Sequence, residues 1–168
     1  SIGQGEVEVV PLQMANLAAT IANRGYYNDP HLIKSMHGTY DTTLHVNQHS
    51  THIDAQYYEP IIEAMNWVVE KPGGTARRAK IEGIEVCGKT GTAENPHGED
   101  HSVFIAFAPK ENPKIAIAVY VENAGFGGTW AAPIASLLME KYIKGSIADT
   151  LKEQRILEAN LLDVKVEK

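Results

Sequence analysis

Residues 84–94 read Ile-Glu-Val-Cys-Gly-Lys-Thr-Gly-Thr-Ala-Glu, and this stretch decides the fold. Ile84 and Val86 alternate with charged and small residues, which favours a β-strand. The residues that follow Gly88 place Lys89, Thr90 and Thr92 close together near the tip of that strand. An ammonium group beside hydroxyl groups can bind a carboxylate and line a reactive serine.

The same segment also satisfies a second motif, because residues 83–90 read G-x-x-x-x-G-K-T, the pattern of a phosphate-binding loop. Such a loop follows a buried strand and opens a helix, whose N-terminus holds the phosphates. Residues 77–82 are too polar for a central strand, and Gly91 together with Asn-Pro-His-Gly at 95–98 breaks any helix. An apolar run that ends in Glu122 is the one feature that favours nucleotide binding. We prefer the strand and keep the phosphate loop as an alternative.

Three strands are expected, over residues 84–94, 102–108 and 114–121. The last two are apolar at nearly every position, which predicts a sheet covered on both faces. The turn at 109–113 is short enough to join them as an antiparallel hairpin. A further pair of short strands is expected within residues 26–53, around Leu32-Ile33 and Leu44-His45-Val46.

Helices are predicted from Pro11 to Arg24, from a capping Asp54 to Lys71, and from Trp130 to Lys144, followed by an amphipathic segment over 147–162. Gly25, Pro72-Gly73-Gly74 and Gly145 are the expected stops, and Thr75 is a candidate cap for one further short turn. The inward-facing residues are predicted to be Tyr57, Ile61, Met65 and Val68 in the second helix and Ile134, Leu137, Leu138 and Tyr142 in the third. The fold class is therefore α/β in layers, an antiparallel sheet with helices on both faces.

Composition excludes several function classes. The 168 residues suffice for one domain or part of one, and the net charge of −6 argues against a nucleic-acid footprint. Cys87 is the single cysteine, so no internal disulfide can form, and its apolar neighbours indicate a buried, inert thiol. His97, Glu99, Asp100 and His101 lie close together in sequence, but a solvated loop explains them better than a metal site. No residue pattern calls for a cofactor.

Several short motifs occur in order around the Lys-Thr-Gly strand. They are Gly3-Gln4-Gly5, Pro11-Leu12-Gln13, Gly74-Thr75-Ala76, Gly88-Lys89-Thr90-Gly91-Thr92-Ala93, Phe104-Ile105-Ala106-Phe107-Ala108-Pro109 and Val121-Glu122-Asn123. This order and spacing resembles the C-terminal half of the transpeptidase domain of class B penicillin-binding proteins, whose third signature is Lys-Thr-Gly. The details around Asp100-His101 and Ala131-Ala132-Pro133-Ile134 are most similar to the elongation-type branch, penicillin-binding protein 2. The resemblance covers residues 1–145, and we treat 146–168 as a separate helical tail.

The resemblance implies a site with two further elements, a Ser-x-x-Lys helix that carries the nucleophile and a Ser-x-Asn loop. No serine of this chain is followed three positions later by lysine. In the family both elements precede the Lys-Thr-Gly strand, so we expect them upstream of Ser1, and we expect the chain alone to be inactive. The start at Ser1 without methionine agrees with an excised fragment.

By the same resemblance the parent enzyme is a peptidoglycan D,D-transpeptidase, which attacks the D-Ala-D-Ala end of a stem peptide and is acylated by β-lactams. The implied site residues are Lys89, which places positive charge beside the serine and the terminal carboxylate; Thr90 and Thr92, whose hydroxyls bind that carboxylate; and Gly91, which lets substrate backbone approach. The Thr92 N–H is implied as half of the oxyanion hole. No cofactor or metal is implied.

The resemblance also implies a location on the periplasmic face of the inner membrane and contact with the cell-elongation machinery. A non-catalytic penicillin-recognising sensor or scaffold remains an alternative, since it would keep Lys-Thr-Gly without a competent serine. A sheet of only three strands leaves an open edge, so we expect the chain to self-associate.

Overall fold

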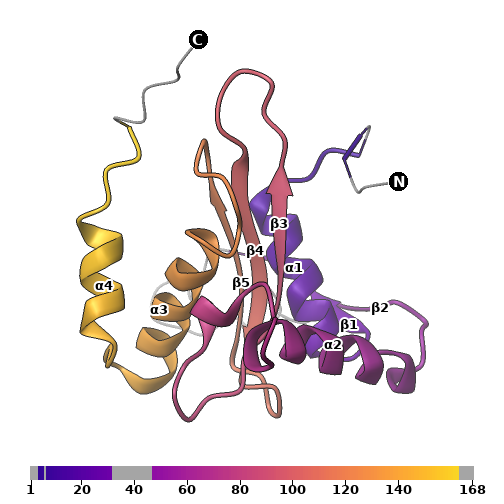
Figure 1. The fold of residues 1–168 in the computed structure, drawn as a ribbon. Coiled ribbons are helices and arrows are strands. Elements are labelled where there is room, and N and C mark those ends of the chain that lie inside the picture. Colours follow the sequence, from indigo (N-terminus) through magenta and orange to yellow (C-terminus); the bar gives the residue numbers. More distant parts are fainter. Residues whose placement is uncertain (1–3, 6, 32–46, 163–168) are drawn as a thin grey trace, which may run out of the picture.

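A three-stranded antiparallel sheet forms the centre of the computed structural model, which describes residues 4–5, 7–31 and 47–162. The strands are β3 (Cys87–Ala93), β4 (His101–Ala108) and β5 (Ile115–Val121), in the order β3-β4-β5 (Figure 1). Gly91 lies opposite Val103, and Phe104 lies opposite Val119. The expected strands and hairpin are confirmed, except that residues 84–86 precede β3 and Ile84 makes an isolated bridge with Ile81.

Helices cover both faces of this sheet, as expected from its apolar strands. Figure 1 shows α1 (Pro11–Ala22) on one side and α3 (Ala131–Lys144) on the other, with α2 (Glu59–Glu70) crossing one end of the sheet near β3. Phe107 packs in one hydrophobic cluster with residues of α1 and α2, and Phe104 packs in another with α3. Side chains alternate between the two faces of a strand, so these two phenylalanines, three positions apart, point to opposite faces. Both are completely buried because helices cover both faces.

Met65 of α2 is buried as predicted and Val68 packs against the core, but the other two predicted positions differ from the buried ones by one residue. Ile62, Met65 and Val69 are buried, whereas Tyr57 and Ile61 are 62% and 47% exposed. A 3₁₀ turn, η2 (Ala55–Tyr57), precedes the helix, so α2 begins at Glu59 and Tyr57 lies outside it. Asp54 is therefore not a side-chain cap; its backbone oxygen accepts a hydrogen bond from the Tyr57 N–H at 3.0 Å.

The inward face of α3 also differs from the prediction in part, although Leu137 is buried as expected. Ala132, Ala135 and Met139 are fully buried, whereas Leu138 and Tyr142 are 52% and 66% exposed. The helix packs several alanines together with Met139 against the sheet and leaves Leu138 and Tyr142 outside. Gly145 ends the helix as expected, in the left-handed conformation at φ 79°.

The N-terminal helix begins as its sequence predicts. Pro11 occupies the first turn, and the Val10 N–H donates to Gln13 Oε1 at 2.9 Å, so the Pro-Leu-Gln motif closes the free end of the helix. After Gly25, β1 (Tyr26–Asn28) pairs antiparallel with β2 (Gln48–Ser50), which confirms a short pair of strands in this region. The apolar stretches at 32–33 and 44–46 lie outside the described residues.

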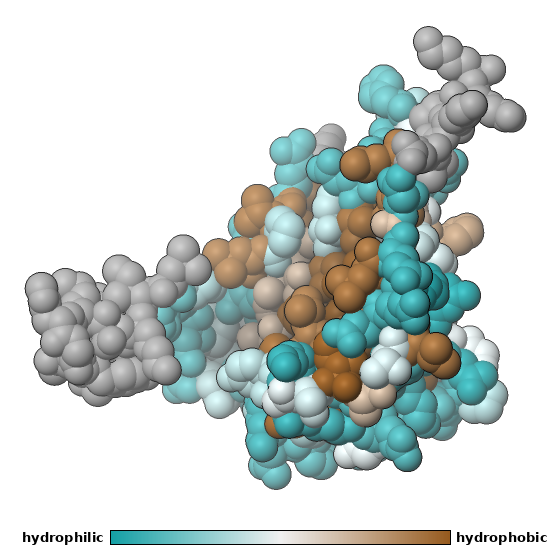
Figure 2. Space-filling model, turned by 90° about the vertical axis from the view of Figure 1, so that its left-hand side faces the viewer, coloured by the Kyte–Doolittle hydropathy of each residue, from teal (hydrophilic) through white to brown (hydrophobic). Residues whose placement is uncertain are grey.

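The tail forms one short helix, α4 (Thr150–Leu157), which lies beside α3 and has no buried residue. Its contacts are polar: Lys152 Nζ donates to Lys80 O at 3.1 Å and to Ser136 Oγ at 3.3 Å. Figure 2, which views the molecule from this side, shows apolar side chains at the surface, and Leu138 of α3 and Leu151 of α4 are among the exposed ones.

The sheet has two outer edges without a strand partner in the described part of the chain, one on β3 and one on β5. The side chains of β5 are half-buried or exposed along its whole length. An edge of this kind can pair with another chain. Self-association of the chain therefore stays a prediction.

The register of α2 can be tested with two neighbouring isoleucines. Ile62→Ala removes a fully buried side chain from the α1–α2 cluster and should lower the free energy of unfolding by about 2–5 kcal/mol. Ile61→Ala is the matched control, and the same truncation at this half-exposed position should cost less than about 1.5 kcal/mol. Urea unfolding measures both. Equal losses, or a larger loss at Ile61, would contradict the observed face.

Candidate functional site

The four predicted site residues lie together on β3, on opposite faces of one strand. Lys89 and Gly91 share the face of Cys87, which belongs to the α1–α2 side, and Thr90 and Thr92 share the α3 side. Lys89 is exposed, and its ammonium group donates to the Thr90 carbonyl at 2.7 Å. The positive charge and the hydroxyl groups can therefore meet a ligand only at the outer edge of β3, where no strand of the described chain is paired.

A pocket of about 520 Å³ opens beside Thr90 and Thr92. It is lined by three segments: the strand, the Gly74–Arg78 region and the loop before α3. Its residues are Gly74, Thr75, Arg77, Arg78, Thr90, Thr92, Phe126, Gly127, Gly128 and Thr129. Hydroxyl and guanidinium groups are thus the polar side-chain functions of the pocket, and none of the described residues that line it carries a carboxylate.

Thr75 belongs to this site, which the sequence did not reveal. We expected it to cap a turn, but η3 (Arg77–Ala79) has no side-chain cap, and Thr75 Oγ1 lies 2.9 Å from Thr90 Oγ1 instead. The bond joins the Gly74-Thr75-Ala76 motif to the Lys-Thr-Gly motif. A Cβ on Gly74 would lie 2.3 Å from the Val68 oxygen, so glycine is what lets this segment pass α2 closely. The only signal in the sequence for this role was that the Gly74-Thr75-Ala76 motif occurs in order before the Lys-Thr-Gly motif.

The loop before α3 forms the opposite wall and depends on two glycines. A Cβ on Gly127 would lie 2.2 Å from Val103 O and 2.5 Å from Gly91 O, and one on Gly128 would lie 2.3 Å from Thr75 O. The fully buried Ser102 holds this loop, because its hydroxyl donates to Phe126 O at 3.0 Å and accepts from the Ala131 N–H at 3.1 Å. The wall is thus fixed against the backbone of β3 and β4.

The tail reaches the same wall. The Arg155 guanidinium of α4 donates to Thr129 O at 2.8 Å and lies 4.8 Å from the centre of the Trp130 ring. Trp130 stands at the N-cap position of α3, outside the residues that line the pocket.

Cys87 is not a candidate nucleophile for this site. It is fully buried beneath α2, and burial raises the pKa of its thiol to about 12. A thiol held neutral in this way is a poor nucleophile. The prediction of a buried thiol is confirmed.

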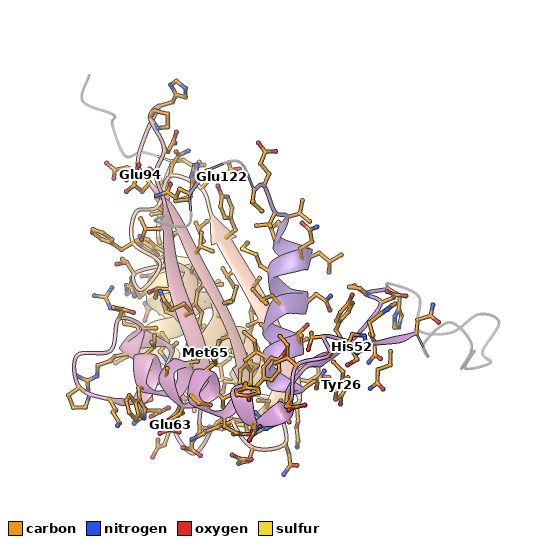
Figure 3. All side chains as sticks on the ribbon, turned by 90° about the vertical axis from the view of Figure 1, so that its right-hand side faces the viewer. Tyr26, His52, Glu63, Met65, Glu94 and Glu122 are labelled. Atoms are coloured by element: carbon orange, nitrogen blue, oxygen red, sulfur yellow. The ribbon has the colours of Figure 1, made fainter. Side chains whose placement is uncertain are left out.

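The polar residues after β3 hydrogen-bond to one another and hold a loop. Asn95 donates to Asn123 Oδ1 at 2.6 Å, the Asn123 N–H donates to His101 Nδ1 at 3.0 Å, and Asp100 Oδ1 accepts from the Asn95 N–H. Within the described ranges no group of three or more His, Cys, Asp or Glu side chains is arranged to hold a metal ion. Figure 3 shows Glu94 at the end of the sheet away from Glu63 and Met65 of α2; it is exposed, and its N–H donates to Gln4 Oε1 at 2.9 Å.

The phosphate-loop alternative is wrong. Residues 88–90 lie inside β3, and the next element is the strand β4, so this segment opens no helix. Without a helix N-terminus the backbone N–H groups that would bind phosphate are committed to a sheet or point to its edge.

Comparison with known proteins places the chain in a family. The model of the penicillin-binding protein transpeptidase domain matches residues 1–140, and the chain belongs to this family. The resemblance drawn from its motifs is confirmed, as is the fold class.

Curated relatives and solved structures agree with this assignment. The peptidoglycan D,D-transpeptidase PbpA of Mycolicibacterium smegmatis is 38% identical over 91% of this chain and 31% of its own length. MrdA of Haemophilus influenzae is 34% identical over 84% of this chain and 25% of its own. The crystal structure of Pseudomonas aeruginosa PBP2 in complex with WCK 5153 matches with a TM-score of 0.73 at 32% identity, over 89% of this chain and 33% of that one. The chain thus spans about a quarter to a third of the length of these relatives.

One ceftriaxone acyl-enzyme structure is also similar, that of penicillin-binding protein A from M. tuberculosis, with a TM-score of 0.70 at 33% identity, over 84% of this chain and 34% of that one. In the part of our chain that the structure describes, every helix is too short or too polar to cross a membrane.

The close approach of the pocket wall to β3 predicts a specific sensitivity. Gly127→Ala forces the new methyl group onto the Val103 and Gly91 carbonyls, so it should lower the free energy of unfolding by about 1–3 kcal/mol. Gly5→Ala, where an added Cβ meets nothing within 4 Å, is the control and should change stability by less than about 0.5 kcal/mol. Chemical denaturation measures both, and a neutral Gly127→Ala would show that the loop does not rest on the strand.

Proposed function

We propose that this chain supplies the Lys-Thr-Gly strand to the active site of a peptidoglycan D,D-transpeptidase. The observation that carries the proposal is the arrangement at β3: an unpaired outer edge in the described chain, a lysine on one face, and two threonine hydroxyls that open into a pocket on the other. An extended peptide can add to such an edge as a further strand, which gives the backbone its hydrogen bonds. The family assignment supports the same reading.

The reaction is acyl transfer in two steps. A serine oxygen attacks the carbonyl carbon of the penultimate D-Ala, the peptide bond breaks, and the leaving D-Ala nitrogen takes a proton. The amine of a second stem peptide then attacks the ester, releases the serine and forms the cross-link. A β-lactam enters the first step only, because its ring nitrogen stays tethered to the acyl group. The serine comes from outside this chain, in which no Ser-x-x-Lys sequence occurs.

Each site residue has a role in these steps. Lys89 places a cation at the strand edge, where it stabilises negative charge and assists proton movement around the serine. The Thr90 and Thr92 hydroxyls bind the terminal carboxylate of the donor peptide, and the Thr92 N–H stabilises the oxyanion. Gly91 leaves the strand surface free of a side chain where the substrate backbone lies. The ammonium must leave the Thr90 carbonyl to reach the serine, which costs little at an exposed position.

The location and the partners belong to the same proposal. We assign the parent protein to the periplasmic face of the inner membrane, where peptidoglycan is made, and to the cell-elongation machinery, on the strength of its PbpA and MrdA relatives. Stem peptides and β-lactams are its ligands.

Covalent labelling with a fluorescent penicillin tests the proposal in the full-length protein. Lys89→Ala should slow labelling by roughly 10²-fold or more, since it removes the cation beside the nucleophile. Lys141→Ala, on the exposed side of α3, is the matched control and should label like the wild type. A folded wild-type protein that takes no label would contradict the proposed transpeptidase activity and favour a non-catalytic scaffold.

A further inference from the structure

Two adjacent arginines line the pocket beside the site threonines. Arg77 and Arg78 lie on η3, between the buried Ala76 and Ala79, and both border the space into which Thr90 and Thr92 open. The family motif contains Thr75, Thr90 and Thr92, but it assigns nothing to these arginines. They are exposed, so their guanidinium groups stand at the mouth of the pocket rather than in the core.

Neither guanidinium has an acidic partner in the described chain, which separates them from the cations around them. Lys80 pairs with Glu70 at 2.7 Å, Lys144 with Glu140 at 3.0 Å, and Lys152 with Asp149 at 3.6 Å. The protein as a whole carries a net charge of −6, so acidic partners are abundant. Among the described residues, two neighbouring arginines without an acidic partner, at a pocket with no carboxylate in its lining, create a local excess of positive charge.

The turn that carries the arginines is firmly placed. Ala76 and Ala79 are fully buried in the α3-side cluster, and the Ala76 N–H donates to Val68 O at 3.0 Å. The neighbouring Thr75 is tied to Thr90 by its hydroxyl. The backbone of η3 is therefore held at a fixed place relative to β3, and only the two side chains need to adjust to a ligand.

We propose that Arg77 and Arg78 bind the carboxylate that the Thr90 and Thr92 hydroxyls recognise, and that they make the site selective for substrates with a free, ionised C-terminal carboxylate. The inference rests on the proposed function and deepens it. Hydroxyl groups alone bind a carboxylate and a neutral ester or amide through similar hydrogen bonds. A guanidinium discriminates between them. Its N–H donors pair with both carboxylate oxygens, and its positive charge attracts a carboxylate but not a neutral end group. The arginines are thus binding residues, whereas the reacting atoms lie at the strand edge.

Two probes that differ only in this charge test the inference: benzylpenicillin and benzylpenicillin methyl ester. The second-order rate constant for acylation of the full-length protein is measured with each, on the wild type, Arg77→Gln, Arg78→Gln and the double variant. Benzylpenicillin should acylate the double variant about 5- to 30-fold more slowly than the wild type, as expected for the loss of a charged contact at an exposed site. Its rate with the methyl ester should equal that of the wild type.

Two further variants sharpen the reading. Arg77→Lys/Arg78→Lys keeps the charge but loses the planar fork, so it should recover part of the rate with benzylpenicillin. Lys141→Gln removes one positive charge from the far side of α3 and should leave both rates unchanged.

The proposal is overturned if the double variant slows acylation by both probes equally, which would make the arginines structural, or if it slows neither. The proposed function fails separately: in that case neither probe acylates the wild type or any of the arginine variants.

Discussion

The close contact of Gly127 and Gly128 with the backbone of β3 and its neighbours is the constraint on which the rest of the site depends. Any side chain at these positions would collide with carbonyl oxygens of Val103, Gly91 or Thr75. The contact therefore fixes this wall of the pocket against the two strands. Ser102 keeps the contact in place by joining the loop to the first residue of α3.

The sheet serves this arrangement by separating its two faces. The α1–α2 side receives Cys87 and Phe107, and the α3 side receives Phe104 and Ala106. A strand buried in this way on its inner part cannot slip by one residue without exposing an apolar side chain, which fixes the register of β3 against β4. That register places Lys89 on one face and the threonines on the other. A ligand that contacts both the Lys89 ammonium and the threonine hydroxyls therefore has to lie at the edge of this strand.

The strands and the position of the Lys-Thr-Gly motif on one of them could be predicted because their signals are local. An apolar run, a short turn and a Lys-Thr-Gly motif each lie within a few residues, and each was placed correctly. The roles of Lys89, Thr90, Gly91 and Thr92 stay a prediction. The inward faces of α2 and α3 were wrong in part. Met65 and Leu137 are buried as predicted, but the neighbours that share their faces are set by packing in three dimensions. Periodicity alone favoured Ile61 and Leu138 over Ile62 and Met139. The roles of Thr75 and Ser102 could not be predicted either, since their partners, Thr90 and Phe126, lie 15 and 24 positions away in the chain.

The most direct test of the account is a crystal structure of the full-length protein acylated by benzylpenicillin. The account predicts an antibiotic that lies along the outer edge of β3, with its acyl oxygen on the Thr92 N–H and its carboxylate within hydrogen-bond distance of the Thr90 and Thr92 hydroxyls. An acylated serine whose ligand leaves β3 untouched, with the carboxylate bound elsewhere, would contradict the claim that this strand forms one wall of the active site.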